Sequence, residues 1–165
     1  MESEPHTPAR KKRNPLRWLK STSRRTFCVY PVAIIAIELT IRGGELPFVP
    51  WGLPLLLWGY LQYHLGGNYR TLHGGGGPGI EVPPERIVDT GIYHYIRNPM
   101  YLGHMIFMVG LAITFRSWAA VALLVFHVFW FNARAKEDEV HLEQLFGDAY
   151  RSYVSRTKRW IPFIY

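Results

Sequence analysis

The chain has 165 residues, of which 48% are apolar, 15% aromatic and 19% charged. The charged fraction is below the roughly 25% of soluble domains, and the apolar content excludes a wholly disordered chain. A single cysteine, Cys28, excludes a disulfide framework and a cysteine-based zinc site. The formal net charge of +7 indicates a polyanionic partner, either nucleic acid or an anionic membrane surface.

Residues 1–25 form a basic, proline-containing arm that carries eight lysines and arginines. An apolar stretch follows directly, so we interpret the arm as a topology signal that contacts anionic lipid headgroups rather than nucleic acid. We expect no cleavable signal peptide, because the first apolar stretch comes after the polar arm and lacks a small-residue cleavage site.

Four apolar stretches follow, at about 27–41, 46–65, 100–115 and 118–133. A helix that crosses a membrane needs about 20 apolar residues. The second stretch meets this length, the third and fourth are marginal, and the first is the shortest. Buried helices of a soluble protein are the alternative, but four such stretches would leave too few polar helix faces to cover them. We therefore predict an all-α, polytopic membrane protein with about four transmembrane helices.

The lysines and arginines predict how these helices are oriented. Seventeen of the 19 lie in the arm, in the loop 66–99 or beyond the fourth stretch, whereas Arg42 and Arg116 alone lie in the alternate loops. Basic residues concentrate on the cytoplasmic side of membrane proteins. We expect both termini and the 66–99 loop to be cytoplasmic, with the arm of 1–25 followed by one membrane domain over 26–165.

Local patterns place three further features. Residues 66–79 contain seven glycines, and we predict a flexible linker there because no strand precedes them to form a phosphate-binding loop. Asn98-Pro99 is typical of a helix start, with asparagine at the cap and proline at the first helical position. Apolar residues at helical spacing predict a C-terminal helix over about 134–156, which extends the fourth helix into the cytoplasm or lies along the interface.

Polar residues on either side of Arg116 are predicted to pair across the third and fourth helices. Arg97 lies 19 residues before Arg116 and Glu139 lies 23 after it, so the two converge near the cytoplasmic boundary. His104 and His127 lie at matching depth within the apolar stretches. An ion pair that only fixes the hairpin, and a histidine satisfied by a neighbouring hydrogen bond, are the alternatives to chemistry. Two histidines without further ligands predict no metal site.

Arg97 and Glu139 each belong to a longer motif, and the two motifs follow one another along the chain. The first is Gly91-x-Tyr93-x-x-x-Arg97-Asn98-Pro99-x-Tyr101-x-Gly103, and the second is Glu139-x-x-Leu142-x-x-x-Phe146-Gly147-x-x-Tyr150-x-x-Tyr153. Together they closely resemble the isoprenylcysteine carboxyl methyltransferase and phospholipid methyltransferase family of integral membrane methyltransferases, over about residues 70–160. Asn98 stands where that family often has histidine, and Asp138-Glu139 stand where it often has paired glutamates. These departures leave the methyl acceptor open.

The resemblance implies that S-adenosylmethionine binds near the cytoplasmic face and that a lipophilic acceptor, a carboxylate, amine or thiol, arrives from the bilayer. It implies that Arg97 holds the cofactor carboxylate and that Glu139 accepts hydrogen bonds from the ribose hydroxyls. An amine or thiol acceptor would need a base, for which His94 or His104 is the candidate. The candidate catalytic residues are Arg97, His104 and Glu139. The candidate cofactor-binding residues are Tyr93, Arg97, Asn98, Pro99, Tyr101, Gly103, Glu139, Tyr150 and Tyr153.

Two alternative functions remain. Residues 160–165 resemble the ending of membrane sterol reductases, which use NADPH, although those proteins are much longer and carry additional spans. A non-enzymatic membrane scaffold is the other alternative. Titration with S-adenosylmethionine and with NADPH separates the three.

Overall fold

The computed structural model describes residues 21–77 and 82–160. Helices make up almost all of the regular structure in these two ranges, and no strand forms there apart from one isolated parallel bridge between Ile96 and Lys158. The predicted all-α class is confirmed. Most of the basic arm, and all of residues 161–165 with their reductase-like pattern, lie outside the described ranges.

The first apolar stretch forms a helical segment that starts before the predicted residue 27. It runs through α2 (Thr22–Arg24), the π-helical turn η1 (Arg25–Val29) and α3 (Tyr30–Ile41). Each cap residue between these pieces has α-helical dihedral angles, so the chain turns continuously. The earlier start brings Arg24 and Arg25, which we assigned to the arm, into the helix.

The second stretch begins with the short η2 (Pro50–Gly52) and continues as α4 (Leu53–Gly74). The prediction of a flexible linker over 66–79 is wrong for residues 66–74, which are helical. The helix ends only where Gly75 and Gly76 adopt positive φ angles of 75° and 71°. Glycine adopts this region without steric cost, so it is the late glycines that end the helix.

The third helix begins where the sequence predicts. A short turn, η3 (Gly91–His94), precedes α5 (Pro99–Thr114), which has proline at its first position. Asn98 occupies the cap position, but its side chain makes no capping hydrogen bond. Its amide instead donates to the backbone carbonyl of Arg159, 3.4 Å away. The cap residue therefore ties the start of α5 to the C-terminal segment.

The fourth helix extends far beyond its apolar part. α6 (Trp118–Phe146) is one continuous helix, and Ser117 caps it by accepting a hydrogen bond from the Ala120 amide at 3.1 Å. Gly147, with a φ angle of 54°, breaks the chain direction before α7 (Asp148–Arg156). The predicted C-terminal helix over 134–156 is thus the second half of α6 followed by a separate short helix.

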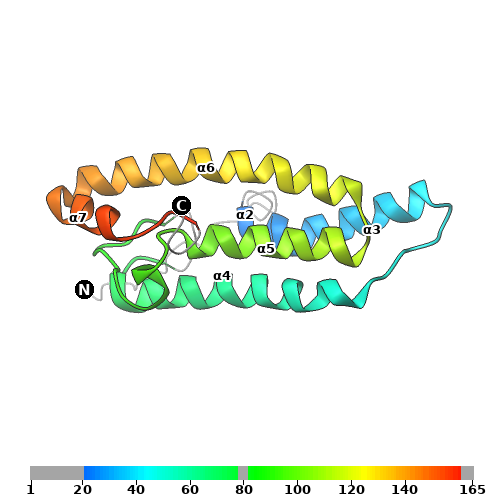
Figure 1. Ribbon diagram of the computed structural model, residues 1–165, viewed down its shortest axis with the longest axis horizontal. Coiled ribbons are helices and arrows are strands. Elements are labelled where there is room, and N and C mark those ends of the chain that lie inside the picture. Colours follow the sequence, from blue (N-terminus) through cyan, green and yellow to red (C-terminus); the bar gives the residue numbers. More distant parts are fainter. Residues whose placement is uncertain (1–20, 78–81, 161–165) are drawn as a thin grey trace, which may run out of the picture.

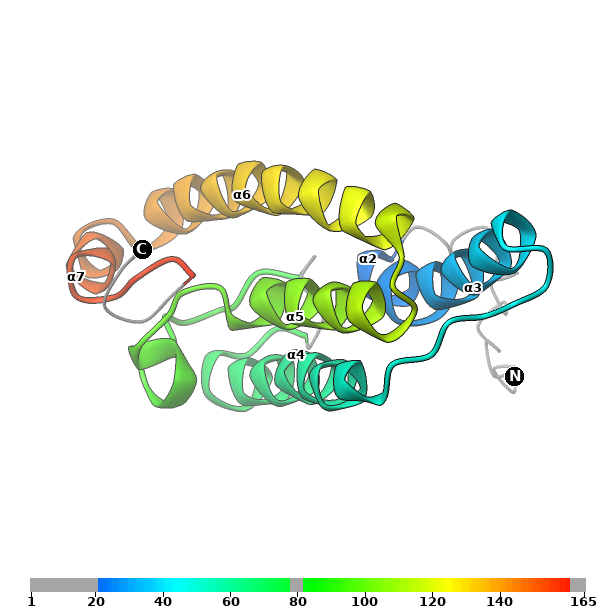
Figure 2. The same ribbon diagram turned by 45° about the vertical axis from the view of Figure 1, so that its right-hand side comes forward.

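α5 is the central helix of the bundle. Figures 1 and 2 both show α4, α5 and α6 side by side, with α5 in the middle and α3 beside one end of them. Buried apolar residues from α4, α5 and α6, together with Trp160, make the larger core cluster. A smaller cluster joins α3 to the far end of α5 and the start of α6.

α4 and α5 approach each other through glycine. A Cβ atom on Gly59 would lie 2.5 Å from the Phe107 amide nitrogen, and one on Gly103 would lie 2.8 Å from the Gly59 carbonyl oxygen. Gly52 and Gly110 are equally close to the partner helix. These four glycines, which we call the glycine contact, permit a backbone approach that is typical of helix pairs in membranes.

The number of membrane-crossing helices is not confirmed. Among the described residues, one helix, α6, is long and apolar enough by length and composition to cross a membrane, and α5 is a shorter apolar helix. α4 has sufficient length, but its C-terminal half is polar and rich in glycine. Large apolar side chains are nevertheless exposed along the bundle, among them Trp51, Trp118 and Phe129.

Candidate functional site

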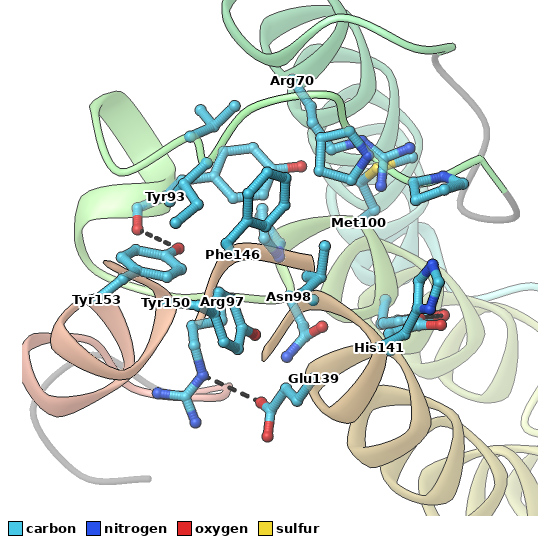
Figure 3. Close-up of a pocket in the computed structure, with 18 of the residues that line it drawn as sticks. Arg70, Tyr93, Arg97, Asn98, Met100, Glu139, His141, Phe146, Tyr150 and Tyr153 are labelled. Atoms are coloured by element: carbon cyan, nitrogen blue, oxygen red, sulfur yellow. Dashed lines mark hydrogen bonds and ion pairs between the residues drawn. The ribbon is translucent and has the colours of Figure 1, made fainter. Parts of the chain in front are cut away.

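A cavity of about 370 Å³ opens at the end of the bundle where α5 begins. Figure 3 shows side chains from α4, the segment before α5, the second half of α6 and α7 pointing toward it. Its lining combines prolines and aliphatic residues with tyrosines and charged groups. The lining residues are Arg70, Pro83, Pro84, Ile87, Val88, Tyr93, Arg97, Asn98, Pro99, Met100, Tyr101, Arg134, Glu137, Asp138, Glu139, His141, Leu142, Phe146, Tyr150 and Tyr153.

The predicted pairing of Arg97 with Glu139 is present. The Arg97 Nε donates to Glu139 Oε1 at 3.0 Å, and both side chains are largely buried, with 10% and 14% of their surfaces exposed. Arg97 also donates to the backbone carbonyls of Val154 and Thr157. Glu139 accepts two further hydrogen bonds from Arg159, at 3.0 and 2.6 Å. The two residues are therefore held rigidly at the edge of the cavity.

A second polar pair, Tyr101 and Asp138, joins α5 to α6. The Tyr101 hydroxyl donates to Asp138 Oδ2 at 2.6 Å, and Arg134 lies 3.3 Å from the other oxygen of the same carboxylate. Tyr101 has 4% of its surface exposed. Phe131 and Trp160 pack on its ring, with centroid distances of 5.0 and 6.1 Å. This packing fixes the direction of the hydroxyl.

Three buried tyrosines close the other wall. The Tyr153 hydroxyl donates to the Tyr93 carbonyl at 2.8 Å, and the Tyr93 hydroxyl donates to the Gly66 carbonyl at 3.2 Å. Burial raises the pKa of Tyr93 to about 12, and burial also raises the pKa of Tyr150 and of Tyr153. All three hydroxyls are neutral at physiological pH, so this wall offers uncharged aromatic faces.

The cavity brings together eight of the ten predicted site residues. They come from both motifs and are Tyr93, Arg97, Asn98, Pro99, Tyr101, Glu139, Tyr150 and Tyr153. Gly103 does not line the cavity, because it belongs to the glycine contact with α4.

His104 does not line the cavity either. It is fully buried in the bundle core, where its ring stacks on Phe27 and Phe131 with centroid distances of 4.8 and 5.5 Å. Neither ring nitrogen has a hydrogen-bond partner in the described part of the chain. His127, which the sequence places at matching depth, bonds to the Leu123 carbonyl and to Tyr30 and not to His104. His94, the other candidate base, is exposed on η3 and does not line the cavity.

Several lining residues were missed by the sequence reasoning. Asp138, which precedes Glu139, and Leu142, which belongs to the second motif, were not assigned to the site. Together with His141 they follow Arg134 at helical spacing on one face of α6. Arg70 had no such signal, because it lies in the part of α4 that we predicted to be a linker. The C-terminal segment that carries Arg159 reaches the site only through the tertiary fold.

Comparison with known proteins bears on this region directly. Residues 79–149 match the model of the phospholipid methyltransferase family. This part of the chain is therefore similar to that family. It includes the first motif, all of α5 and α6, and most of the cavity lining.

Several known proteins that are similar to this chain are methyltransferases. The chain is 34% identical over 80 residues to a protein-S-isoprenylcysteine O-methyltransferase of Schizosaccharomyces pombe, covering 47% of this chain and 34% of that protein. It is 31% identical over 81 residues to protein-S-isoprenylcysteine O-methyltransferase B of Arabidopsis thaliana, covering 48% of this chain and 41% of that protein. The Homo sapiens protein-S-isoprenylcysteine O-methyltransferase is 30% identical over 81 residues, which is 47% of this chain and 28% of that protein. The chain thus matches less than half the length of each relative.

Proposed function

We propose that the protein is an integral membrane methyltransferase that uses S-adenosylmethionine and acts on a lipophilic acceptor. One observation carries the proposal. Two motifs that are separated by 42 residues at Arg97 and Glu139 converge on a single cavity, and the region that matches the methyltransferase family contains both of these residues.

The residues of the cavity fit the proposed cofactor. A volume of about 370 Å³ lies within the roughly 300–1,000 Å³ of small-molecule sites. S-adenosylmethionine has a carboxylate, hydroxyls, an aromatic base and a cationic sulfur. Arg97 is the proposed partner of the carboxylate, and Glu139 that of the hydroxyls. The faces of Tyr93 and Tyr150 suit the base or the sulfonium through stacking and cation–π contacts.

The chemistry depends mainly on positioning. When bound, S-adenosylmethionine supplies a methyl group on a positively charged sulfur; the acceptor attacks the methyl carbon and the sulfur leaves as a neutral thioether. The protein holds cofactor and acceptor in line, which is the largest contribution its rigid walls can make. The interlocked pairs Arg97–Glu139 and Tyr101–Asp138 keep these walls fixed. Apolar lining residues such as Leu142 exclude water from the reacting atoms.

The acceptor determines whether a base is needed. The relatives are named as O-methyltransferases of isoprenylcysteine, which favours an oxygen nucleophile on a lipophilic molecule here. A carboxylate needs no base. An amine or thiol must lose a proton, and Asp138 and His141 are two candidates among the side chains on the cavity wall that can accept it. His94 and His104, the candidate bases from the sequence, do not line the cavity.

We also propose that the protein lies in the membrane with both termini on the cytoplasmic side. The apolar part of α6 and the exposed Trp51, Trp118 and Phe129 support an apolar surrounding. The split of basic residues supports the orientation. This places the cavity at the cytoplasmic boundary, where a soluble cofactor and a membrane-borne acceptor can both reach it.

Calorimetric titration of the detergent-purified protein tests the function. S-adenosylhomocysteine, the demethylated product of S-adenosylmethionine, should bind with one site per chain, and NADPH should not bind. Binding of NADPH alone would favour the reductase alternative, and binding of neither would favour the scaffold.

Two matched variants locate the binding. Leu142→Trp fills the cavity, whereas Leu145→Trp places the same ring on the same helix at a side chain that is 54% exposed and does not line the cavity. We expect the first to lower S-adenosylhomocysteine affinity at least 100-fold and the second to leave it unchanged. Equal affinity in both variants would place the cofactor elsewhere.

A further inference from the structure

The C-terminal segment 157–160 returns from α7 to the cavity and inserts between the chain before α5 and the side of α6. Figure 1 shows this segment running back from α7 toward the middle of the bundle. The Arg97 amide donates to the Lys158 carbonyl at 2.8 Å, and the Lys158 amide donates to the Tyr95 carbonyl at 3.3 Å. The segment is thus paired, backbone to backbone, with the motif that carries Arg97.

Buried side chains anchor the segment at both ends. Thr157 is 5% exposed and donates to the Tyr153 carbonyl at 2.7 Å. Trp160 is 7% exposed and packs against the ring of Tyr101 in the main core cluster. A buried aromatic side chain contributes substantially to the stability of the core, unlike the poorly ordered residues common at chain ends. The segment is therefore an integral part of the cavity wall.

Arg159 joins the segment to the charged edge of the cavity. Its guanidinium grips both oxygens of Glu139, with Nε 3.0 Å from Oε1 and Nη2 2.6 Å from Oε2. Arg159 also reaches the Asn132 side chain at 3.4 Å, and its side chain is only 17% exposed. Arg97 contributes one hydrogen bond to the same carboxylate. Most of the hydrogen bonding that orients Glu139 therefore comes from the C-terminal segment.

We propose that residues 157–160 form a latch on the cavity, with Arg159 as the positioning residue that orients Glu139 and, through it, Arg97. Two-point binding by a planar guanidinium fixes the carboxylate in rotation as well as in position, which a single contact cannot do. Without Arg159, Glu139 keeps the lone Arg97 contact and Oε2 loses the partner described above. The part of this inference that concerns cofactor binding rests on the proposed function, whereas the latch itself does not.

Hydrogen exchange measured by mass spectrometry tests the latch without any ligand. The variant Arg159→Ala should speed exchange of the Arg97 and Lys158 amides roughly tenfold or more, because opening of the latch exposes both. Peptides from the α4–α5 contact should keep wild-type exchange. Arg151→Ala is the matched control, since Arg151 is an exposed arginine paired with Glu143 and Asp148 on α6 and α7. It should leave both amides unchanged.

Arg159→Lys tests the geometry. Lysine retains the charge but not the planar fork, so exchange at the two amides should lie between wild type and Arg159→Ala. Wild-type exchange in Arg159→Ala, or acceleration spread evenly over the chain, would overturn the latch. The latter would show a general structural role.

Titration with S-adenosylhomocysteine tests the positioning role. Affinity should fall roughly tenfold in Arg159→Ala, fall less in Arg159→Lys and stay unchanged in Arg151→Ala. Accelerated exchange with unchanged affinity would overturn the positioning of the ligand-binding residues by Arg159. Absence of binding in the wild-type protein would instead refute the proposed function, and the exchange data would still decide the latch.

Discussion

The close approach of α4 and α5 predicts a sharp difference between two glycines on one helix. Gly59 and Gly66 are both buried in α4, two turns apart. A Cβ on Gly59 would lie 2.5 Å from the Phe107 nitrogen and 2.6 Å from the Gly103 oxygen, both backbone atoms. A Cβ on Gly66 would lie 3.4 Å from the Met100 side chain and 3.6 Å from the Pro99 ring, which are ordinary contacts with side chains. The same methyl group is therefore excluded at one site and accommodated at the other.

The cost follows from the distances. At Gly59 the new carbon is 0.9 Å closer than the 3.4 Å at which ordinary contact begins, and the obstacle is backbone. Overpacking of this kind costs about 1–3 kcal/mol. Replacing glycine by alanine within a helix gains up to about 1 kcal/mol in propensity, equally at both sites. The propensity gain cancels in the comparison, so Gly59→Ala should be about 1–3 kcal/mol less stable than Gly66→Ala.

Unfolding of the two purified variants in the same detergent measures this difference. Gly66→Ala should unfold at or above the wild-type midpoint, and Gly59→Ala should unfold below it. Gly103→Ala provides an independent check from the other helix, because its Cβ would lie 2.8 Å from both the Gly59 oxygen and the Tyr63 nitrogen. Equal stability of Gly59→Ala and Gly66→Ala would refute the close approach of α4 and α5.

Three further predictions concern the site, a cap and the topology. Arg97→Ala should weaken S-adenosylhomocysteine binding roughly 10- to 100-fold by calorimetry, and Arg97→Lys should not restore it fully; wild-type affinity in both would remove Arg97 from the site. Ser117→Ala removes the hydrogen bond to the Ala120 amide and should lower the free energy of unfolding by about 0.5–2 kcal/mol, so an unchanged unfolding curve would contradict the cap. In a Cys28→Ser background, Arg116→Cys should react with an impermeant maleimide from the outer side, and labelling from the cytoplasmic side alone would contradict the topology.

Local signals in the sequence predicted the elements whose ends are set by local chemistry. Asn98-Pro99 placed the start of α5 correctly, because proline at the first helical position fits the backbone geometry there. The glycines after residue 65 led to a wrong prediction for the C-terminal end of α4. The sequence suggested flexibility over 66–79, but Gly66, Gly67 and Gly74 are buried helical residues. Whether a glycine packs or ends a helix depends on the neighbouring helix, which the sequence does not show.

In the candidate site, too, local sequence predicted some features and tertiary packing determined the others. Counting residues outward from Arg116 correctly predicted that Arg97 meets Glu139. The count works because α5 and α6 are antiparallel, have the same rise per residue and are joined by a tight turn. The same counting gave His104 and His127 a common depth, and both rings contact Phe131. Depth alone did not show that His104 faces the bundle core. Arg159 and the path of 157–160 had no local signal at all, since only tertiary packing brings them to the cavity.

The first motif combines two physical tasks on one short stretch of α5. Tyr101 points toward Asp138 and the cavity, whereas Gly103, two residues later, lies against the backbone of α4. Two residues along an α-helix turn the side-chain direction by about 200°, so these positions necessarily serve opposite faces. We therefore expect a substitution at Gly103 to displace α5 and Tyr101 with it, although the glycine does not line the cavity. The motif is best understood as a site together with the packing contact that positions it, which explains why Gly103 and Tyr101 lie in one short motif although only Tyr101 lines the cavity.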